Sequence, residues 1–301
     1  MKWEKYMKKK HRGSVIFAIL AAALYAISAP ASKLLLKEIP PVMMAALLYL
    51  GAGMGMLILG TMRKLWNKKS SEHKLTKKEL PYTIAMILLD IAAPILLLVG
   101  LKMTTAANAS LLNNFEIVAT SCIAFFVFKE IIHKRLAIAI GLITLSSIIL
   151  SVEDLSSFSF SFGSIVVLLA CICWGFENNC TRMMSDKDPL QIVIIKGFCS
   201  GACSLVIALS IGEKISSPIY IFAALSLGFV AYGLSIFFYV YAQRELGAAK
   251  TSAYYAIAPF IGVMLSLLIF HDIPSSSFVV ALIIMIVGTY FASSKKKEKS
   301  L

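Results

Sequence analysis

The sequence predicts an all-α membrane protein with ten transmembrane helices, arranged as two inverted repeats of five, with both chain ends in the cytoplasm. Three observations lead to this prediction. Of the 301 residues, 59% are hydrophobic and 15% are charged, whereas a soluble domain has about 45–50% apolar and about 25% charged residues. The apolar residues form blocks long enough to cross a bilayer. Basic residues gather in alternate loops, and the two halves of the chain resemble each other. The composition excludes a soluble enzyme and a disordered chain.

Ten apolar segments are expected to cross the membrane. They cover residues 14–35, 41–60, 82–101, 107–128, 135–152, 162–182, 190–211, 218–241, 250–270 and 277–293. The first is too long for a cleaved signal and precedes no soluble domain, so we interpret it as a span. Six cysteines lie within these blocks, where buried Cys behaves as a small hydrophobe.

The basic residues predict the orientation. With residues 1–13 and 294–301 as cytoplasmic tails, 24 of the 29 basic residues fall on the cytoplasmic side, one lies within a span, and four fall outside: Lys33, Lys37, Lys102 and Lys214. This asymmetry is typical of cytoplasmic loops and accounts for the net charge of +13. Nucleic acid is not an expected partner, because no soluble segment is long enough to form a basic face.

An internal repeat relates residues 14–152 to residues 162–293. Lys102 and Glu130 match Arg244 and Asp272 at one shared spacing along the chain, and Pro40 matches Pro189 at a slightly longer one. Five spans per repeat is an odd number, so the halves would enter the membrane in opposite directions. Inverted repeats are typical of alternating-access transporters, whose substrate site lies near the midplane.

The stretch LGAAKTSAYYAIAPFIGVMLSLLIFHD, residues 246–272, resembles the ninth-helix motif of EamA-type transporters in the drug/metabolite transporter superfamily. The matching residues are Ala248, Ala249, Pro259 and Asp272. YAISAPASK and CWGFENNCTR also resemble the starts of the family's two repeats. The first-half copy of the motif has Ile117 where the family usually has proline. The resemblance covers about residues 13–293. It implies ten helices, a multi-pass location in the cell membrane, and secondary transport of small solutes, without naming one.

Four ionisable residues inside spans are candidates for the transport site: Asp90, Glu116, Glu177 and Lys196. Such groups each cost about 2.5–3.5 kcal/mol to insert and usually serve function. Asp90 lies four residues before Pro94, which leaves the carbonyl of residue 90 without its helical partner. The carboxylate and this free carbonyl together suit a cation or ammonium site. The alternative is a carboxylate that serves packing.

Polar neighbours extend two of these candidates. Glu116 shares a helix face with Asn113 and Thr120, and Glu177 shares one with Trp174 and Thr181. The alternatives are polar contacts between helices for Glu116 and pairing with Arg182 or Lys196 for Glu177.

Lys196 either binds a substrate carboxylate or neutralises one of the acids. Tyr255 joins the list because Pro259 frees its carbonyl; four further tyrosines that could line a path are Tyr25, Tyr232, Tyr239 and Tyr254. Pro30, Pro94 and Pro259 are candidate hinges. Gly51, Gly53 and Gly55 would permit close helix approach.

Three acids against one lysine favour a cationic or zwitterionic amine. Desolvation and like neighbours favour the protonated form of a buried carboxylate, so we expect proton-coupled transport with Glu116 or Asp90 as carrier. The leading hypothesis is secondary transport of a small polar metabolite, an amino acid or related amine, and the family resemblance implies export. A multidrug or cationic-compound transporter and a sugar or nucleoside transporter are alternatives.

An intramembrane enzyme or a channel is a more distant alternative. The sequence has no H-E-x-x-H, G-x-S-x-G or phosphate-loop motif. We therefore expect no catalytic residue, metal or cofactor. The expected partners are a small-molecule substrate and the lipid bilayer, and a homodimer is left open.

Overall fold

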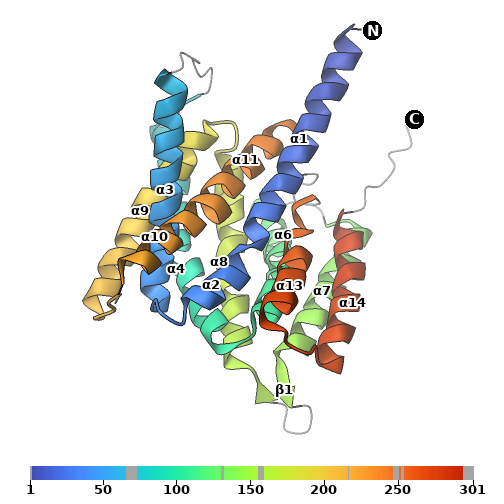
Figure 1. The fold of residues 1–301 in the computed structure, drawn as a ribbon. Coiled ribbons are helices and arrows are strands. Elements are labelled where there is room, and N and C mark those ends of the chain that lie inside the picture. Colours follow the sequence, from blue (N-terminus) through green and yellow to red (C-terminus); the bar gives the residue numbers. More distant parts are fainter. Residues whose placement is uncertain are drawn as a thin grey trace.

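The computed structural model describes residues 2–65, 73–129, 132–154, 159–215, 217–246, 251 and 254–293. Within these ranges the chain is a bundle of helices (Figure 1), which confirms the all-α prediction. Eight described segments are long and apolar enough to cross a membrane, and the two shorter apolar helices Ala258–Phe270 and Ser276–Ala292 lie in the last two predicted segments. The number of ten crossings stays a prediction.

The first half of the chain forms seven α-helices and one short 3-10 helix. They are α1 (Lys2–Ala26), α2 (Ser28–Leu35), α3 (Pro41–Leu65), η1 (Lys77–Glu79), α4 (Leu80–Met103), α5 (Ala106–Leu112), α6 (Phe115–Phe128) and α7 (Lys134–Ser151). The short antiparallel strands β1 (Val152–Asp154) and β2 (Ser159–Phe160) connect this half to the next.

The second half continues the bundle. Its elements are α8 (Phe162–Met183), α9 (Pro189–Ser210), α10 (Pro218–Leu227), the π-helix η2 (Gly228–Leu234), α11 (Ser235–Leu246), α13 (Ala258–Phe270) and α14 (Ser276–Ser293). Proline occupies the first position of α3, α9 and α10, where its missing N–H costs no helical hydrogen bond.

Three of the predicted spans contain a helix interruption. The chain breaks between α1 and α2 at Ile27, three residues before Pro30, and Pro259 lies in the first turn of α13 beside a break at residues 256–257. Asn113 and Asn114 form the turn between α5 and α6, which breaks although Ile117 replaces the family's proline. Pro94, by contrast, lies within the uninterrupted α4.

The helices of the two halves pack against each other in pairs. α4 packs along α8, α3 along α9, α1 along α11 and α7 along α14, while α5 packs on α13. The predicted close approach at the glycines of α3 is confirmed: a Cβ atom at Gly51 would overlap the carbonyl oxygen of Leu225, and one at Gly55 would overlap the ring of Phe229.

Charged side chains hold two helix ends. Lys33 Nζ donates to the carbonyl oxygens of Leu101 and Thr104 at 2.5 and 2.6 Å, where the end of α4 exposes unpaired acceptors. Glu213 accepts a 2.6 Å hydrogen bond from the N–H of Met43 at the start of α3. Both contacts connect segments far apart in the sequence.

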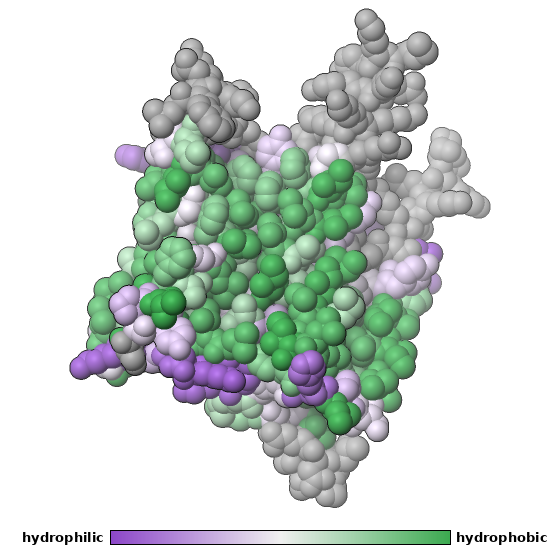
Figure 2. Space-filling view, in the orientation of Figure 1, coloured by the Kyte–Doolittle hydropathy of each residue, from purple (hydrophilic) through white to green (hydrophobic). Residues whose placement is uncertain are grey.

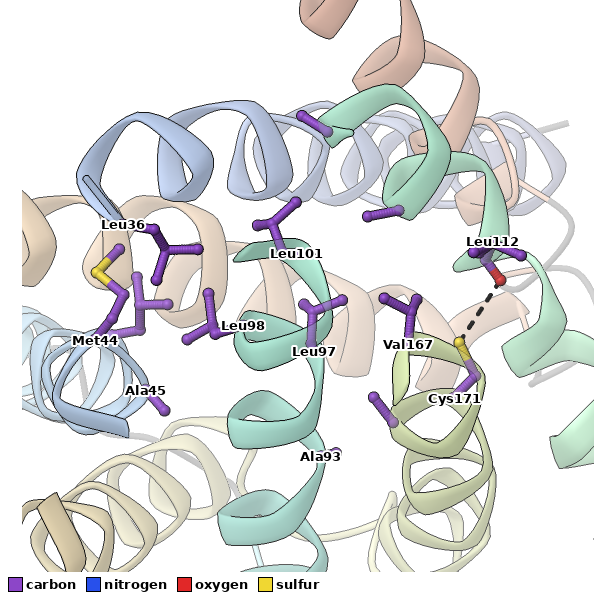
Figure 3. Close-up of a cluster of buried hydrophobic side chains, with 14 of the residues drawn as sticks. Leu36, Met44, Ala45, Ala93, Leu97, Leu98, Leu101, Leu112, Val167 and Cys171 are labelled. Carbon is purple, nitrogen blue, oxygen red and sulfur yellow. Dashed lines mark hydrogen bonds between the residues drawn. The ribbon is translucent and has the colours of Figure 1, made fainter. Parts of the chain in front are cut away.

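The bundle has one large buried apolar core and also exposes apolar side chains on its outside. Figure 3 shows part of this core: the labelled side chains are Leu36, Met44, Ala45, Ala93, Leu97, Leu98, Leu101, Leu112, Val167 and Cys171. Figure 2 shows a broad apolar outer face with hydrophilic residues gathered along one edge. Large hydrophobic residues such as Phe126, Ile219 and Leu268 are more than 60% exposed, which suits contact with lipid tails.

Candidate functional site

A buried ion cluster connects α4, α8 and α9. Lys196 Nζ of α9 lies 2.9 Å from Glu177 Oε1 of α8 and 3.1 Å from Asp90 Oδ2 of α4. The side chains of Lys196, Glu177 and Asp90 are 6%, 4% and 0% exposed, respectively. Lys196 therefore neutralises acids, which was one of the two interpretations of its sequence position.

Two hydroxyl groups complete this ion cluster of Asp90, Glu177 and Lys196. The Tyr49 hydroxyl of α3 donates to Asp90 Oδ1 at 2.8 Å, and the Thr181 hydroxyl donates to Glu177 Oε1. Both carboxylates thus have the lysine and one hydroxyl as partners. Because a buried charge is tolerated only when paired and hydrogen-bonded, the cluster ties four helices together.

Glu116, the third acid within the predicted spans, has a different environment from Asp90 and Glu177. Asn178 Nδ2 of α8 donates to Glu116 Oε1 at 2.5 Å and also faces the hydroxyl of Thr120 at 3.4 Å. Glu116 interacts electrostatically with Glu177 and Lys196, yet no ion pair within 4.0 Å joins it to a basic group of the described residues. Its side chain retains partial solvent accessibility.

Tyrosine rings form a continuous group beside the acids. The ring centroids of Tyr25 lie 6.0 Å from Tyr232 and 5.7 Å from Tyr255, and Tyr49 lies 5.5 Å from Tyr232. Tyr239 extends the group with a 4.9 Å edge contact to Tyr255.

Two further contacts connect this tyrosine group to the rest of the site. Ser28 donates to the Tyr232 hydroxyl at 3.2 Å. Glu116 interacts electrostatically with Tyr25 and Tyr255. Since Tyr49 also binds Asp90, the acids and the tyrosines belong to one site.

The structure brings together most, but not all, of the sequence-predicted residues. Asp90, Glu177 and Lys196 are in direct contact. Asn113, at the break after α5, faces the thiol of Cys171. Trp174 is 6% exposed and belongs to the main apolar core. Glu130 lies outside the described residues.

The predictions missed Tyr49, Asn178 and Ser28 as members of the site. The internal repeat contains a usable indication for one of them, because Ser28 occupies the same repeat position as Glu177. In the same way, Tyr232 occupies the repeat position of Asp90. Tyr49 has no such indication, because its position beside Asp90 depends on how α3 and α4 pack.

The part of the chain that the structure describes holds no group of three or more His, Cys, Asp or Glu side chains arranged for a metal ion. The site offers carboxylates, an amide and aromatic rings. The carboxylates and the aromatic ring faces can bind an ammonium ion, and the carboxylates can also take up or release a proton.

Comparison with known proteins identifies relatives over most of the chain. A model of the EamA-like transporter family matches residues 12–152 and again residues 161–294. An uncharacterized transporter of Methanothermobacter thermautotrophicus is 26% identical over 289 residues, covering 91% of this chain and 84% of that protein. The uncharacterized transporter YyaM of Bacillus subtilis is 22% identical, with coverages of 73% and 75%.

A solved crystal structure also superimposes with a TM-score of 0.66 at 17% identity, covering 93% of this chain and 96% of the other. At that identity the likeness shows the fold alone.

Proposed function

The chain belongs to the EamA-like transporter family, and on this premise we propose that it is a secondary active transporter that exports a small polar metabolite, an amino acid or related amine, in exchange for protons. As a multi-pass membrane protein, it would act in the cytoplasmic membrane. The substrate would bind where the ion cluster meets the tyrosine group.

The proposed framework is two inverted five-helix repeats, over residues 14–152 and 162–293, with both ends in the cytoplasm. The double family match supports it. In the predicted repeat, α1 corresponds to α8 and α4 corresponds to α11. The contact of α4 with α8 and the contact of α1 with α11 are therefore equivalent contacts with the two halves interchanged, which supports the repeat. Lys129 and His271, which match in the internal repeat, end α6 and α13 with the same left-handed backbone conformation. The start of α1 and the end of α14 lie toward the same side in Figure 1.

The observation that carries the proposal is the difference between the three acids. Asp90 and Glu177 share Lys196 as a counter-ion. Glu116 has the neutral amide of Asn178 as its hydrogen-bonding partner. A carboxylate without a cation in a low-dielectric site gains most from a proton or a substrate ammonium group. Of the two predicted carriers, Glu116 and Asp90, these contacts favour Glu116.

Competition at one carboxylate gives a mechanism of exchange. In the inward-open state, a cytoplasmic amine would displace the proton from Glu116. After the halves rearrange, an external proton would displace the amine outside and reset the site. Coupling requires that substrate and proton exclude each other at Glu116 and that the halves rearrange only when one of them is bound.

A transporter of larger cationic compounds is the second candidate, and the tyrosine group favours it because aromatic faces attract cations. A sugar or nucleoside transporter of the same fold would not need an unpaired carboxylate. The remaining alternatives predicted from the sequence, an intramembrane enzyme and a channel, lack a comparable structural argument.

The test is uptake by the purified protein in proteoliposomes, with radiolabelled amino acids, amines, sugars and nucleosides and with protein-free liposomes as the measure of passive permeation. We expect saturable uptake and counter-transport of amines or amino acids, with a rate that depends on pH. Pairing wild type with Glu116→Gln and Asp90→Asn, singly and together, assigns the carrier. Unchanged pH dependence in the double variant would refute proton coupling, and uptake of sugars or nucleosides alone would refute the substrate class.

A further inference from the structure

We infer that the substrate is a cationic amine with an apolar body and without a free carboxylate, and not a zwitterionic amino acid. This rests on the proposed function and narrows it to one chemical class. The juxtaposition that carries it is a partly buried acid, Glu116, with no ion pair to a basic group of the described residues, a lysine already paired with two acids, and a group of tyrosine rings. Each of these observations concerns a different part of the ligand.

The first step concerns the carboxylate of an amino acid. Lys196 is the one buried cationic side chain in the ranges that the structure covers, and both Asp90 and Glu177 lie within about 3 Å of its ammonium group. A substrate carboxylate would have to displace one of these acids, which would then lose its own counter-ion. An unpaired buried charge is strongly disfavoured, so the site has no vacant partner for an anion.

At two of the interrupted helices, α6 and α13, N–H groups near the helix start already have partners within the chain. The α6 N-terminus already carries the Glu116 carboxylate in its first turn, and the N–H groups of Glu116 and Ile117 donate to the carbonyls of Asn113 and Asn114 at 3.1 and 3.0 Å.

At the start of α13, the N–H groups of Phe260 and Ile261 both donate to the carbonyl of Ile257 at 3.2 Å, and Pro259 has no N–H to offer. These N–H groups are therefore already bonded within the chain, whereas carboxylate binding at a helix start uses free ones.

The second step concerns the ammonium group. Glu116 has one neutral hydrogen-bond donor, Asn178, and no basic group within ion-pair distance in the described chain. The acids Asp90, Glu116 and Glu177 against Lys196 leave the site with a formal excess of negative charge. A ligand with one positive charge and no negative charge reduces that excess, whereas a zwitterion does not.

The third step concerns the body of the ligand. Tyr25, Tyr232 and Tyr255 come from three different parts of the chain, and the ring of Tyr25 contacts both of the others. Glu116 interacts electrostatically with Tyr25 and Tyr255, and the side chains of Glu116, Tyr25 and Tyr255 retain accessible surface. An apolar or aromatic group attached to the amine would contact these rings once the ammonium group reaches Glu116.

The repeat explains why one site holds both kinds of group. Asp90 and Asn113 of the first half match Tyr232 and Tyr255 of the second half in the internal repeat. One repeat therefore supplies polar groups where the other supplies rings. Matching positions of inverted repeats meet near the midplane, so both halves would contact the same ligand from opposite sides.

The test compares ligands that differ only at the carboxylate. Phenylalanine, phenylalaninamide and phenethylamine are titrated into the purified full-length protein at neutral pH while thermal unfolding is recorded, because a ligand of the folded state raises the midpoint by mass action. We expect phenethylamine and phenylalaninamide to bind at least about tenfold more tightly than phenylalanine, because an unpaired buried carboxylate is strongly disfavoured. Equal or tighter binding of phenylalanine would overturn the inference and leave the transporter proposal intact.

Absence of any shift with all three compounds would also overturn the inference, and uptake by the proteoliposomes then tests the proposed function separately.

Variants of the protein locate the binding site. Glu116→Gln should remove the phenethylamine shift, while Glu38→Gln, the same change on an exposed loop residue, should keep it. Tyr255→Leu should weaken phenethylamine but not butylamine, and Tyr255→Phe, which keeps the ring, should bind as wild type. An undiminished shift in Glu116→Gln would place the ammonium elsewhere and overturn the inference.

Discussion

Replacing Lys196 by methionine would remove the shared counter-ion of Asp90 and Glu177. At an effective dielectric constant of about 20, unit charges about 3 Å apart attract by about 5 kcal/mol, and removing one partner of a buried pair costs about 3–5 kcal/mol after desolvation is included. Because Lys196 contacts two acids, at 2.9 and 3.1 Å, we expect the upper end of that range. At about 2–4 °C per kcal/mol, the unfolding midpoint would fall by about 10–20 °C.

The assay is thermal unfolding of purified protein followed by intrinsic fluorescence. Lys214→Met, which removes an exposed lysine, is the control and should unfold like wild type. The triple variant Lys196→Met, Asp90→Asn, Glu177→Gln should recover at least half of the loss, because removing all charges of a buried cluster is far less costly than removing one. A wild-type midpoint in Lys196→Met, or a triple variant no more stable than the single one, would refute the argument that Lys196 serves as their counter-ion.

Three further changes have predicted outcomes. Gly51→Ala should destabilise the protein, because its Cβ would overlap a backbone carbonyl of α10, whereas Gly141→Ala, with nothing within 4 Å, should be neutral or slightly stabilising; equal unfolding midpoints would show that α3 and α10 are not so close. Tyr49→Phe removes the 2.8 Å hydrogen bond to Asp90 and should cost about 1.5–3 kcal/mol, as for bonds to charged groups, with denaturant unfolding as the measurement. Pro94→Ala restores an N–H to the carbonyl of residue 90 and should slow counter-transport while the folded state remains as stable as wild type; wild-type transport would exclude Pro94 as a hinge.

The sequence predicted the helical framework well, because apolar blocks and loop charges directly reflect the solvent around each segment. It also identified Asp90, Glu177 and Lys196, since charged residues inside apolar spans stand out. The sequence does not predict which of these three residues pair with each other. Pairing depends on how α4, α8 and α9 are rotated about their axes. A helix that is apolar on all sides has no polar face from which that rotation could be predicted.

Other parts of the site could not be predicted for related reasons. Tyr49 lies in an apolar, glycine-rich span, and its hydrogen bond to Asp90 depends on how α3 packs against α4. The π-helix around Tyr232 contains no proline, so nothing in the sequence indicated an irregular helix there. Ile117 stands where the family usually has proline, yet the chain still breaks nearby at Asn113 and Asn114, two residues that favour turns.

In the proposed mechanism, substrate and proton compete for Glu116. The most direct measurement is the number of protons released when phenethylamine saturates the purified protein in weakly buffered solution. We expect release of up to one proton per protein, which should be lost in Glu116→Gln and retained in Asp90→Asn. Release that persists in Glu116→Gln, or saturable amine binding with no proton release at any pH, would contradict it.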